Sequence, residues 1–230
     1  MIDNQKNTIE KYEKFIIGEI IKLQGKYTPY QIFTDWITMM AISIQNSCYL
    51  IESKVYQERE KTYRAIAAKY SKEEMQIMIK MFAALTNLLE EKFNDYLGEI
   101  YMKSGCGSKM TGQFFTPYHI SYLTASLAYG NTITPNEQGV IEVNEPSTGG
   151  GGMMIAIAQV MKEHDLDYQR KLHIIAQDMD WNGVYMTYIQ LSLLGIRAIV
   201  AQGDTLGDPY HRGYDRARIF KTPAEMGALI

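Results

Sequence analysis

The sequence predicts an α/β protein in which an N-terminal helical bundle precedes an open, mostly parallel sheet. The first hundred residues contain a single proline, and their apolar residues recur at the spacing of an amphipathic helix. From residue 105 onward, β-branched apolar runs alternate with amphipathic segments, which is the order of βαβ units. Small and polar residues fill the stretch between these parts, at 104–113. The pattern therefore predicts a helical domain at 1–104 and an α/β domain at 105–230.

Four helices are predicted in the N-terminal domain, at residues 9–20, 29–50, 56–70 and 75–103. Pro29 suits the first turn of the second helix, where its missing N–H has no partner to lose. Ser71 and Glu74 have the spacing of a capping box before the fourth helix. The methionines of that helix recur at helical spacing, so we interpret them as core residues.

The α/β domain is predicted to contain three strands and the helices between them. The strands are expected at residues 139–146, 172–180 and 196–204, and the helices at 117–130, 151–166 and 181–195. Strands that alternate with helices pair in parallel through right-handed crossovers. Their apolar runs are typical of strands that are covered on both faces. A fourth strand is one interpretation of residues 214–220.

The first predicted strand ends in Glu145, Pro146, Ser147 and Thr148, followed by four glycines at 149–152. Glycines let a backbone turn tightly and approach a ligand, and the following helix offers free N–H groups at its N-terminus. The spacing matches neither a dinucleotide fingerprint nor a P-loop. Glu145 would repel a pyrophosphate and suits a cation, such as the amino group of an amino-acid moiety. The plainer interpretation is a flexible loop or a helix cap.

The second and third predicted strands also end in acidic residues. Asp178 follows the second strand, where an acid can accept both hydroxyls of a ribose. Asp204 follows the third strand and can accept a hydrogen bond from an adenine amino group. Each signal is weak alone, because an acid at a strand end is often a helix cap, and Asp180 is expected to play that part. Acids at three successive strand ends make a stronger signal together.

A further motif lies before the first helix of the α/β domain, at Gly112–His119. Thr116 suits the N-cap of that helix, and Pro117 suits its first position. Phe114 and Phe115 stand just before the cap, so a hydrophobic staple explains part of the motif. Two phenylalanines beside a Gly-Gln pair are more than a cap needs.

Composition and charge exclude several classes of protein. The formal net charge is −3, so no strong basic field indicates a nucleic-acid binder. No apolar run approaches the ~20 residues that a membrane-spanning helix needs. The N-terminus is unlike a targeting sequence, and the two cysteines, Cys48 and Cys106, suit a reducing cytoplasm. The four histidines are too scattered for a ligand set, so no metal site is predicted.

Taken in order, GQFFTP at 112–117, the glycine-rich loop, the acid after the second strand and GDTL at 203–206 resemble the adenine-N6 DNA methyltransferases. The similarity is greatest to the modification subunits of type I restriction systems and their phage-borne relatives. It implies a partial class I, Rossmann-like methyltransferase sheet that is open and truncated after about strand four. It also implies S-adenosylmethionine as the cofactor.

The resemblance assigns roles to particular positions. Phe115, Thr116 and Pro117 match the element that holds the methionine end of the cofactor. Asp178 matches the acid that binds the ribose hydroxyls, and Asp204 matches the acid that meets the adenine ring. The cofactor-binding residues implied in this way are Phe114, Phe115, Thr116, Pro117, Glu145, Pro146, Ser147, Thr148, Gly149, Gly150, Asp178, Met179, Asp204, Thr205 and Leu206.

The catalytic motif of the family, (N/D/S)-P-P-(Y/F) after strand four, is absent from this sequence. In the family its polar residue and a backbone carbonyl accept hydrogen bonds from the flipped adenine, and its aromatic ring stacks on the base. Two stretches resemble remnants of the motif. Asp208-Pro209-Tyr210 lacks one proline, and Thr222-Pro223 follows the candidate fourth strand. These five residues are the catalytic candidates.

Two functions from different classes follow from the resemblance. The first is S-adenosylmethionine-dependent adenine-N6 methylation of DNA. The alternative is a catalytically inactive S-adenosylmethionine-binding protein that acts as a regulatory, anti-restriction or assembly subunit. A third interpretation is a fragment whose other half lies on another chain, since a sheet that ends after strand four has an open edge. We therefore expect a homo-oligomer or a partner protein that covers this edge.

Contact with DNA is predicted at one place only. The concentrated basic residues are Arg212, Arg216, Arg218 and Lys221, near the C-terminus. Such side chains can contact phosphate groups. The plainer interpretation of these residues is a solubilised tail.

Overall fold

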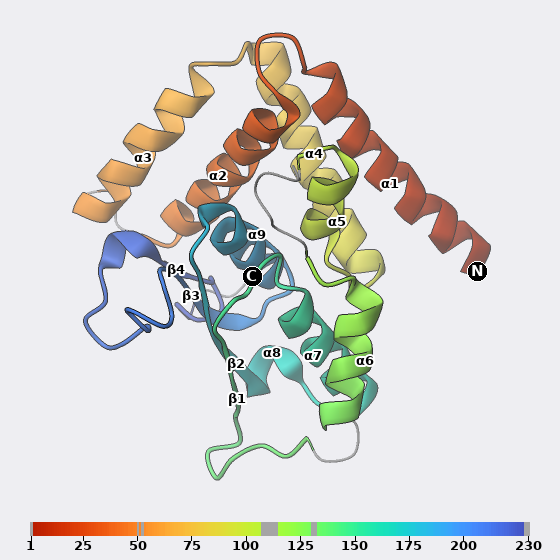
Figure 1. The fold of residues 1–230 in the computed structure, drawn as a ribbon, viewed down its shortest axis with the longest axis vertical. Helices are drawn as coiled ribbons and strands as arrows, with labels where there is room; N and C mark the ends of the chain where they lie inside the picture. The colour runs from red at the N-terminus through yellow and green to blue at the C-terminus, as the bar shows by residue number, and fades with distance from the viewer. Residues whose placement is uncertain (1, 50, 52, 107–114, 130–132, 228–230) are drawn as a thin grey trace.

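The computed structural model describes residues 2–49, 51, 53–106, 115–129 and 133–227 (Figure 1). Its elements, in chain order, are α1 (Ile2–Lys22), α2 (Pro29–Ser47), α3 (Lys54–Ala67), α4 (Lys72–Glu91), α5 (Tyr96–Lys103), α6 (Tyr118–Tyr129), β1 (Ile141–Glu145), α7 (Gly152–Glu163), α8 (Tyr168–Lys171), β2 (Leu172–Asp178), α9 (Trp181–Leu193), β3 (Arg197–Gln202), the 3-10 turn η1 (Arg216–Arg218) and β4 (Ile219–Lys221).

Side chains fix where two of the N-terminal helices begin. Thr28 accepts a hydrogen bond from the backbone N–H of Gln31, whose side chain accepts the N–H of Thr28 in return. Pro29 then occupies the first turn of α2, as predicted. Ser71 and Glu74 form the same reciprocal pair at the start of α4, which confirms the predicted capping box.

The predicted fourth helix is in fact two helices, α4 and α5. Lys92 ends α4 in an extended conformation, with φ −159° and ψ 142°. Asp95 then caps α5 by accepting the N–H of Gly98 at 2.9 Å. The prediction of one continuous helix over 75–103 is therefore wrong, because the Asn-Asp pair at 94–95 favours a cap over a helix interior.

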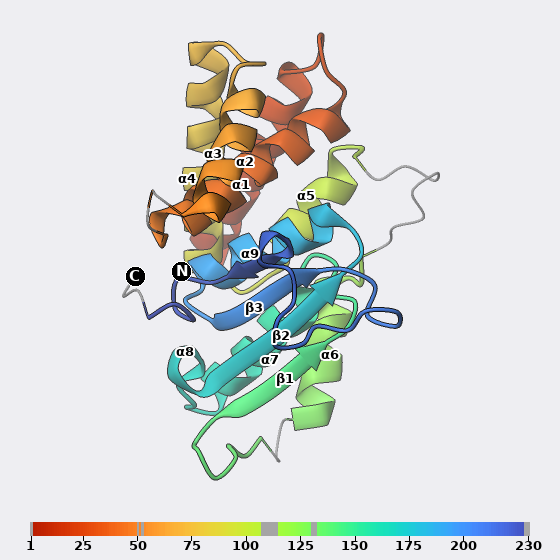
Figure 2. The ribbon, with the colours of Figure 1, turned by 90° about the vertical axis from the view of Figure 1, so that its left-hand side faces the viewer.

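One hydrophobic core joins the N-terminal helices to the sheet. The indole N–H of Trp36 in α2 donates to the carbonyl of Met78 in α4 at 3.1 Å. α2 also packs across α9, and both α4 and α5 contact α9. Figure 2 shows the N-terminal helices stacked over α9 on one side of the sheet. The buried side chains of both regions form a single cluster, so the core crosses the predicted boundary between 1–104 and 105–230.

The sheet has the strand order β1-β2-β3-β4. β1, β2 and β3 are parallel, with Glu145 opposite Ala176 at the carboxyl ends of β1 and β2. β4 runs antiparallel to β3, with Phe220 opposite Val200. The prediction of an open, mostly parallel sheet is confirmed. The candidate fourth strand at 214–220 begins later than expected, at the start of β4.

The helices α6, α7, α8 and α9 all lie on one side of the sheet (Figure 1). This follows from the strand order, because β1, β2 and β3 advance in one direction and right-handed crossovers then place α7 and α9 on the same face. On the opposite face, Glu142 and Asn144 of β1 are exposed. The expectation that the strands are covered on both faces is therefore wrong for β1.

β1 forms an edge of the sheet, since β2 is its only strand partner in the described part of the chain. Near it, α6 exposes an apolar stripe of Ile120, Leu123 and Leu127, which are 42%, 54% and 80% exposed. A hollow of about 350 Å³, lined by Tyr129 and Ile141 among others, lies between the end of α6 and β1. β1, with its unpaired edge, and α6 both lie in the lower half of Figure 2, away from the N-terminal helices.

Candidate functional site

A cavity of about 800 Å³ lies at the carboxyl ends of β1, β2 and β3. Open parallel sheets bind ligands at this edge, where the loops that follow the strands meet. Here the wall also includes residues from the beginnings of α5 and α6. The lining residues are Asp95, Phe115, Thr116, Ser121, Glu145, Pro146, Ser147, Thr148, Gly149, Gly150, Gly152, Met153, Asp178, Met179, Asp204, Thr205 and Leu206.

The glycine loop after β1 turns tightly and is held in place by α9. Gly149 and Gly151 have positive φ angles of 54° and 95°, which residues with side chains rarely adopt. Thr187 Oγ1 donates to the carbonyl of Gly149 at 3.1 Å, and Gln190 Nε2 donates to the carbonyl of Gly150 at 2.7 Å. The backbone from which α7 begins is therefore fixed by side chains of α9.

Asp178 ends β2, and both of its carboxylate oxygens accept hydrogen bonds from the backbone. Oδ2 accepts the N–H of Gly149 at 2.8 Å, and Oδ1 accepts the N–H of Asp180 at 2.9 Å. Burial raises the pKa of Asp178, while these hydrogen bonds act to lower it. Each oxygen keeps a further lone pair, so Asp178 can also accept a ligand hydroxyl. Asp180 caps α9 by accepting the N–H of Asn182, as predicted.

Glu145 ends β1 and lies near Asp178. Its Oε1 accepts the N–H of Ser147 at 3.1 Å. Burial raises the pKa of Glu145, and the charge of Asp178 raises it further. The two carboxylates therefore repel each other across the strand ends, and a cation or a hydroxyl donor between them would relieve that repulsion.

The loop after β3 joins the wall through hydrogen bonds, and one apolar side chain from each of the loops after β2 and β3 lines the cavity. Asp204 Oδ1 accepts the N–H of Leu206 at 3.0 Å. Thr205 Oγ1 donates to the carbonyl of Pro146 at 2.7 Å, which ties this loop to the loop after β1. Met179 and Leu206 are 69% and 98% exposed and both line the cavity. Two apolar side chains are thus available to a flat apolar ligand.

Asp95 lines the cavity from the helical region of the chain. It precedes α5 and is only 4% exposed. Both hydrogen bonds that it accepts end on Oδ1, from Gly98 N–H and from Gln190 Nε2, each at 2.9 Å. Burial raises the pKa of Asp95 above its ordinary value. A Cβ atom at Gly150 would collide with the Asp95 carboxylate, so glycine at 150 makes room for this acid.

Four lining residues are absent from the set that the sequence implies: Asp95, Ser121, Gly152 and Met153. Gly152 nevertheless belongs to the predicted glycine loop. Met153 and Ser121 lie within helices whose starts had been identified as part of the site, so extending those motifs by one turn would have found them. Asp95 gave no such signal. An acid before a helix indicates a cap, which Asp95 also is, and its second role depends on packing between α5 and the glycine loop.

The described lining of the cavity is acidic. It contains four carboxylates, those of Asp95, Glu145, Asp178 and Asp204, and no lysine, arginine or histidine. A cavity of this kind attracts cations and repels phosphate groups. Its chemistry suits a ligand that combines positive charge, hydroxyl groups and a flat apolar ring.

Most residues that the sequence resemblance assigns to the cofactor lie on this cavity. The structure brings together those from the loops after β1, β2 and β3, along with Phe115 and Thr116. Pro117 is exposed before α6 and does not line the cavity. Phe114 lies outside the described residues.

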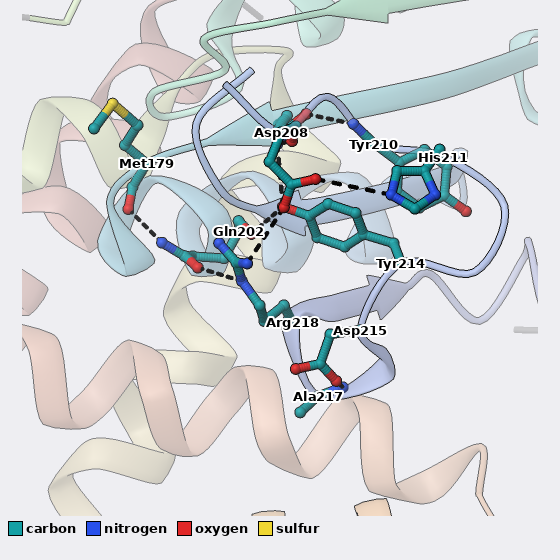
Figure 3. A network of polar contacts seen from close by, with 10 residues as sticks. Met179, Gln202, Asp208, Tyr210, His211, Tyr214, Asp215, Ala217 and Arg218 are labelled. Atoms are coloured by element: carbon teal, nitrogen blue, oxygen red, sulfur yellow. Dashed lines mark hydrogen bonds and ion pairs between the residues drawn. The ribbon is translucent and has the colours of Figure 1, made fainter. Parts of the chain in front are cut away.

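The first catalytic candidate, Asp208-Pro209-Tyr210, does not line the cavity. The Asp208 side chain and the Tyr210 backbone belong to a separate polar network, shown in Figure 3. Asp208 forms an ion pair with Arg218 at 3.6 Å, and His211 Nε2 lies 3.8 Å from Asp208 Oδ1. The backbone N–H of Tyr210 donates to Gln177 Oε1 at 2.9 Å. These contacts fasten the loop after β3 to the sheet and leave the Asp208 carboxylate already paired.

The second candidate, Thr222-Pro223, lies near the amino end of β3, whereas the cavity lies at the carboxyl ends of the strands. β4 is antiparallel to β3, so the residues that follow β4 return toward the beginning of β3. Thr222 is fully buried there, and its hydroxyl donates to the carbonyl of Ile196 at 2.7 Å and accepts the N–H of Ala198 at 2.9 Å. The interpretation of Thr222 and Pro223 as catalytic residues is therefore wrong for this cavity.

The predicted basic residues near the C-terminus are not equivalent. Arg212 and Arg216 are exposed. Arg218 is partly buried, donates to Gln202 Oε1 at 2.9 Å and lies over the ring of Tyr214 (Figure 3). Arg218 therefore stabilises the chain's own loop, and Lys221 is also partly buried. Of the four predicted basic residues, Arg212 and Arg216 are the exposed ones.

Neither a metal cluster nor a membrane helix occurs in the described ranges. No three histidine, cysteine, aspartate or glutamate side chains among those residues are grouped to hold a metal ion. None of the described helices combines the length and the apolar character needed to cross a lipid bilayer.

The part of the chain that carries the cavity matches a known protein family. Residues 92–222, more than half of the chain, match the N-6 DNA methylase family. The matched stretch begins before α5 and ends after β4, so it contains every lining residue of the cavity. No curated protein sequence matches the chain.

Two solved structures are similar to the chain. One is assigned as a class I S-adenosylmethionine-dependent methyltransferase of Listeria monocytogenes, with 15% identity and a TM-score of 0.48, covering 91% of this chain and 56% of that one. The other is a type I restriction-modification methyltransferase subunit of Streptococcus thermophilus, with 10% identity and a TM-score of 0.48, covering 90% of this chain and 61% of that one. The chain thus spans little more than half the length of either protein.

Proposed function

Because the chain belongs to the N-6 DNA methylase family, we propose that it binds S-adenosylmethionine in the cavity and takes part in the adenine-N6 methylation of DNA. S-adenosylmethionine is the cofactor that membership of this family implies. The observation that carries the proposal is the convergence of Glu145, Asp178 and Asp204, from three successive strand ends, on one cavity.

The lining residues fit the nucleoside part of this cofactor. Asp178 would accept hydrogen bonds from the ribose hydroxyls through the lone pairs that its backbone contacts leave free. Asp204 would accept a hydrogen bond from the adenine amino group. Met179 and Leu206, both highly exposed at the wall, would cover the apolar faces of the adenine ring.

The charge of the cavity also supports this ligand. S-adenosylmethionine carries a sulfonium and an ammonium group and has no phosphate. Four carboxylates and no cationic side chain among the described lining residues favour such a ligand over nucleotides that carry phosphates. The absence of both dinucleotide and P-loop spacing in the sequence agrees with this choice.

When bound, the cofactor would supply a sulfonium methyl group for adenine N6, with S-adenosylhomocysteine and one proton from N6 as the other products. The residues of this chain would contribute by orienting the cofactor. Asp178 and Asp204 are fixed by the backbone N–H groups of Gly149 and Leu206, and the glycine loop is fixed by Gln190 of α9. Neither catalytic candidate lines the cavity. We therefore infer that the groups that hold the flipped adenine come from a partner protein or a further polypeptide segment.

Two surfaces of the chain suit these missing components. The unpaired edge of β1 and the apolar stripe of α6 would accept a partner that continues the sheet. Arg212 and Arg216 follow β3 on the way to β4, at the sheet edge that holds the cavity, and their exposed charges would meet DNA phosphates there.

Calorimetric titration of the full chain tests the cofactor proposal. S-adenosylmethionine and S-adenosylhomocysteine are expected to bind, and ATP, as the phosphate-bearing control, is not. Transfer of tritiated methyl groups to DNA of mixed sequence then tests the activity. Binding without transfer would support the inactive regulatory function instead, and failure of both adenosyl ligands to bind would refute the cofactor proposal.

A further inference from the structure

We propose that Asp95 receives the α-ammonium group of the cofactor's amino-acid moiety, so that the helical region supplies part of the cofactor site. The inference rests on the proposed function, because it assigns one end of the same ligand. It adds a residue that neither the sequence motifs nor the strand ends indicate.

Asp95 lies at the end of the cavity away from Asp178 and Asp204, the acids proposed to bind the nucleoside. Gly149 contacts Asp178, whereas the positions of Gly150 and Gly152 face Asp95. A Cβ atom at Gly152 would lie 3.4 Å from both Asp95 Cβ and Ser121 Oγ, so α6 and the Asp95 loop meet at this end. Asp95 therefore lies across the glycine loop from the residue that suits the ribose.

The bonding of Asp95 leaves one oxygen for a ligand. Gly98 and Gln190 both donate to Oδ1, and both donors are neutral. Oδ2 accepts no hydrogen bond from the described residues, and no lysine, arginine or histidine in the described ranges forms an ion pair with Asp95. A buried carboxylate without a cation is unfavourable, and a cationic ligand group at Oδ2 would offset that cost.

Gly98 and Gln190 hold the Asp95 carboxylate in place. Gln190 is fully buried and links three groups: its Nε2 donates to Asp95 Oδ1 and to the carbonyl of Gly150, and its Oε1 accepts the N–H of Leu97 at 3.2 Å. The Asp95 carboxylate and the glycine loop are thus fixed relative to each other before a ligand enters. This is the preorganisation that a charged recognition group requires.

Glu145 is the competing candidate for the ammonium group, since it also ends on the cavity. Its carboxylate accepts the N–H of Ser147 and lies close enough to Asp178 for their charges to interact. Glu145 therefore belongs to the side of the cavity that holds the ribose acid. The geometry favours Asp95 for the amino-acid end and Glu145 for the nucleoside end.

A comparison of two ligands tests the assignment. S-adenosylhomocysteine carries the ammonium group, whereas 5′-methylthioadenosine has the nucleoside and the thioether but no amino-acid moiety. In the full chain, Asp95→Asn is expected to lower the affinity for S-adenosylhomocysteine by about tenfold or more and to change the affinity for methylthioadenosine by less than about twofold. Glu99→Gln, which removes a charge from the same helix but not from the cavity wall, should change neither.

Several outcomes would overturn the assignment. Asp95→Asn weakening both ligands equally would indicate a structural role, and an unchanged affinity for both would remove Asp95 from the site. A ligand-selective loss in Glu145→Gln in place of Asp95→Asn would transfer the role to Glu145. If the unmodified chain bound neither ligand, the proposed function itself would fail, which is a distinct result.

A measurement on the unmodified chain avoids any folding defect of the variants. The deaminated analogue of S-adenosylhomocysteine keeps the carboxylate and lacks only the ammonium group. We expect it to bind at least about tenfold more weakly than S-adenosylhomocysteine. Equal affinity for the two compounds would contradict an acidic receptor for the ammonium group at any position in the cavity.

Discussion

At the scale of single residues, Gly150 matters because of the space beside it. The backbone at Gly150 faces the Asp95 carboxylate, and an added Cβ would collide with Asp95 Oδ2. Gly150→Ala should therefore displace Asp95, lower the free energy of unfolding by about 1–3 kcal/mol and weaken S-adenosylhomocysteine binding. Thermal unfolding and titration of the same preparation would measure both effects.

Gly18→Ala is the matched control for this substitution. Gly18 lies in α1, and an added Cβ there meets no atom within 4 Å. Alanine is favoured over glycine in a helix by about 0.5–1 kcal/mol, so this variant should be slightly stabilised and bind normally. Equal behaviour of the two variants would show that the close approach of Asp95 to the glycine loop is unimportant.

Asp95 should also give the stability of the ligand-free chain a particular pH dependence. Burial raises the pKa of Asp95 in the folded state, so the folded chain binds this proton more tightly than the unfolded chain. The stabilising contribution of this group is complete below the unfolded pKa of about 3.9 and is lost as the pH rises through the higher folded value. Asp95→Asn removes that loss.

The expected result is a variant that is more stable than the parent at neutral pH but binds the cofactor more weakly. The difference in unfolding temperature between Asp95→Asn and the parent should widen from about pH 4 to about pH 8. Thermal unfolding monitored by circular dichroism across this range would measure it. A difference that stays constant with pH would mean that the Asp95 carboxyl is not the group responsible.

At the scale of elements, the direction of β4 determines where Thr222 lies. The antiparallel pairing with β3 carries Thr222 to the edge of the sheet opposite the cavity, where its hydroxyl bonds to the backbone of Ile196 and Ala198. Thr222→Val leaves those two groups without this partner and should cost about 1–3 kcal/mol of stability. Because Thr222 is remote from the cavity, the affinity for S-adenosylhomocysteine should change by less than about twofold.

Thr222→Ser keeps the hydroxyl and serves as the control. It should recover most of the stability that Thr222→Val loses, as measured by denaturant unfolding. A loss of cofactor affinity in Thr222→Val at unchanged stability would contradict the structural role. It would return Thr222 to the list of candidate site residues.

The strand-end acids were predictable from sequence because their convergence is a local rule. Glu145, Asp178 and Asp204 each follow an apolar run, and parallel strands bring their carboxyl ends to one edge whatever else the chain does. The direction of β4 was not predictable in this way. It depends on pairing between Phe220 and Val200 after a long loop, and no local pattern encodes that choice.

The same distinction explains the break between α4 and α5. The residues on both sides of Lys92 keep helical spacing, so periodicity alone extends one helix through them. Asp95 instead caps a new helix and packs against the glycine loop. Asp95 and Gly150 are far apart in the sequence, and no local pattern predicts their contact. Sequence reasoning could therefore not identify Asp95 as a lining residue.

At the scale of the whole molecule, one buried cluster joins the helical region to the sheet that carries the proposed cofactor cavity. α2, α4 and α5 all pack on α9, and α9 in turn holds the glycine loop through Thr187 and Gln190. Arg59 of α3 adds a link to the last strand, since it donates to the carbonyl of Ile219 at 2.6 Å and lies over the ring of Phe220. Contacts of this kind couple the two regions energetically.

The two tryptophans of the chain can measure that coupling, since one lies in each region. Trp36 is buried in α2, and Trp181 begins α9 beside Phe220. Trp181→Phe leaves Trp36 as the reporter, and Trp36→Phe leaves Trp181. If the core unfolds as one unit, the fluorescence midpoint should equal the circular dichroism midpoint in each variant. S-adenosylhomocysteine at 100 times its Kd should then stabilise both by about 2.7 kcal/mol. A Trp36 transition that is separate and insensitive to the ligand would instead make residues 1–104 an independent domain. Asp95 would then lie outside the cooperative unit that binds the cofactor.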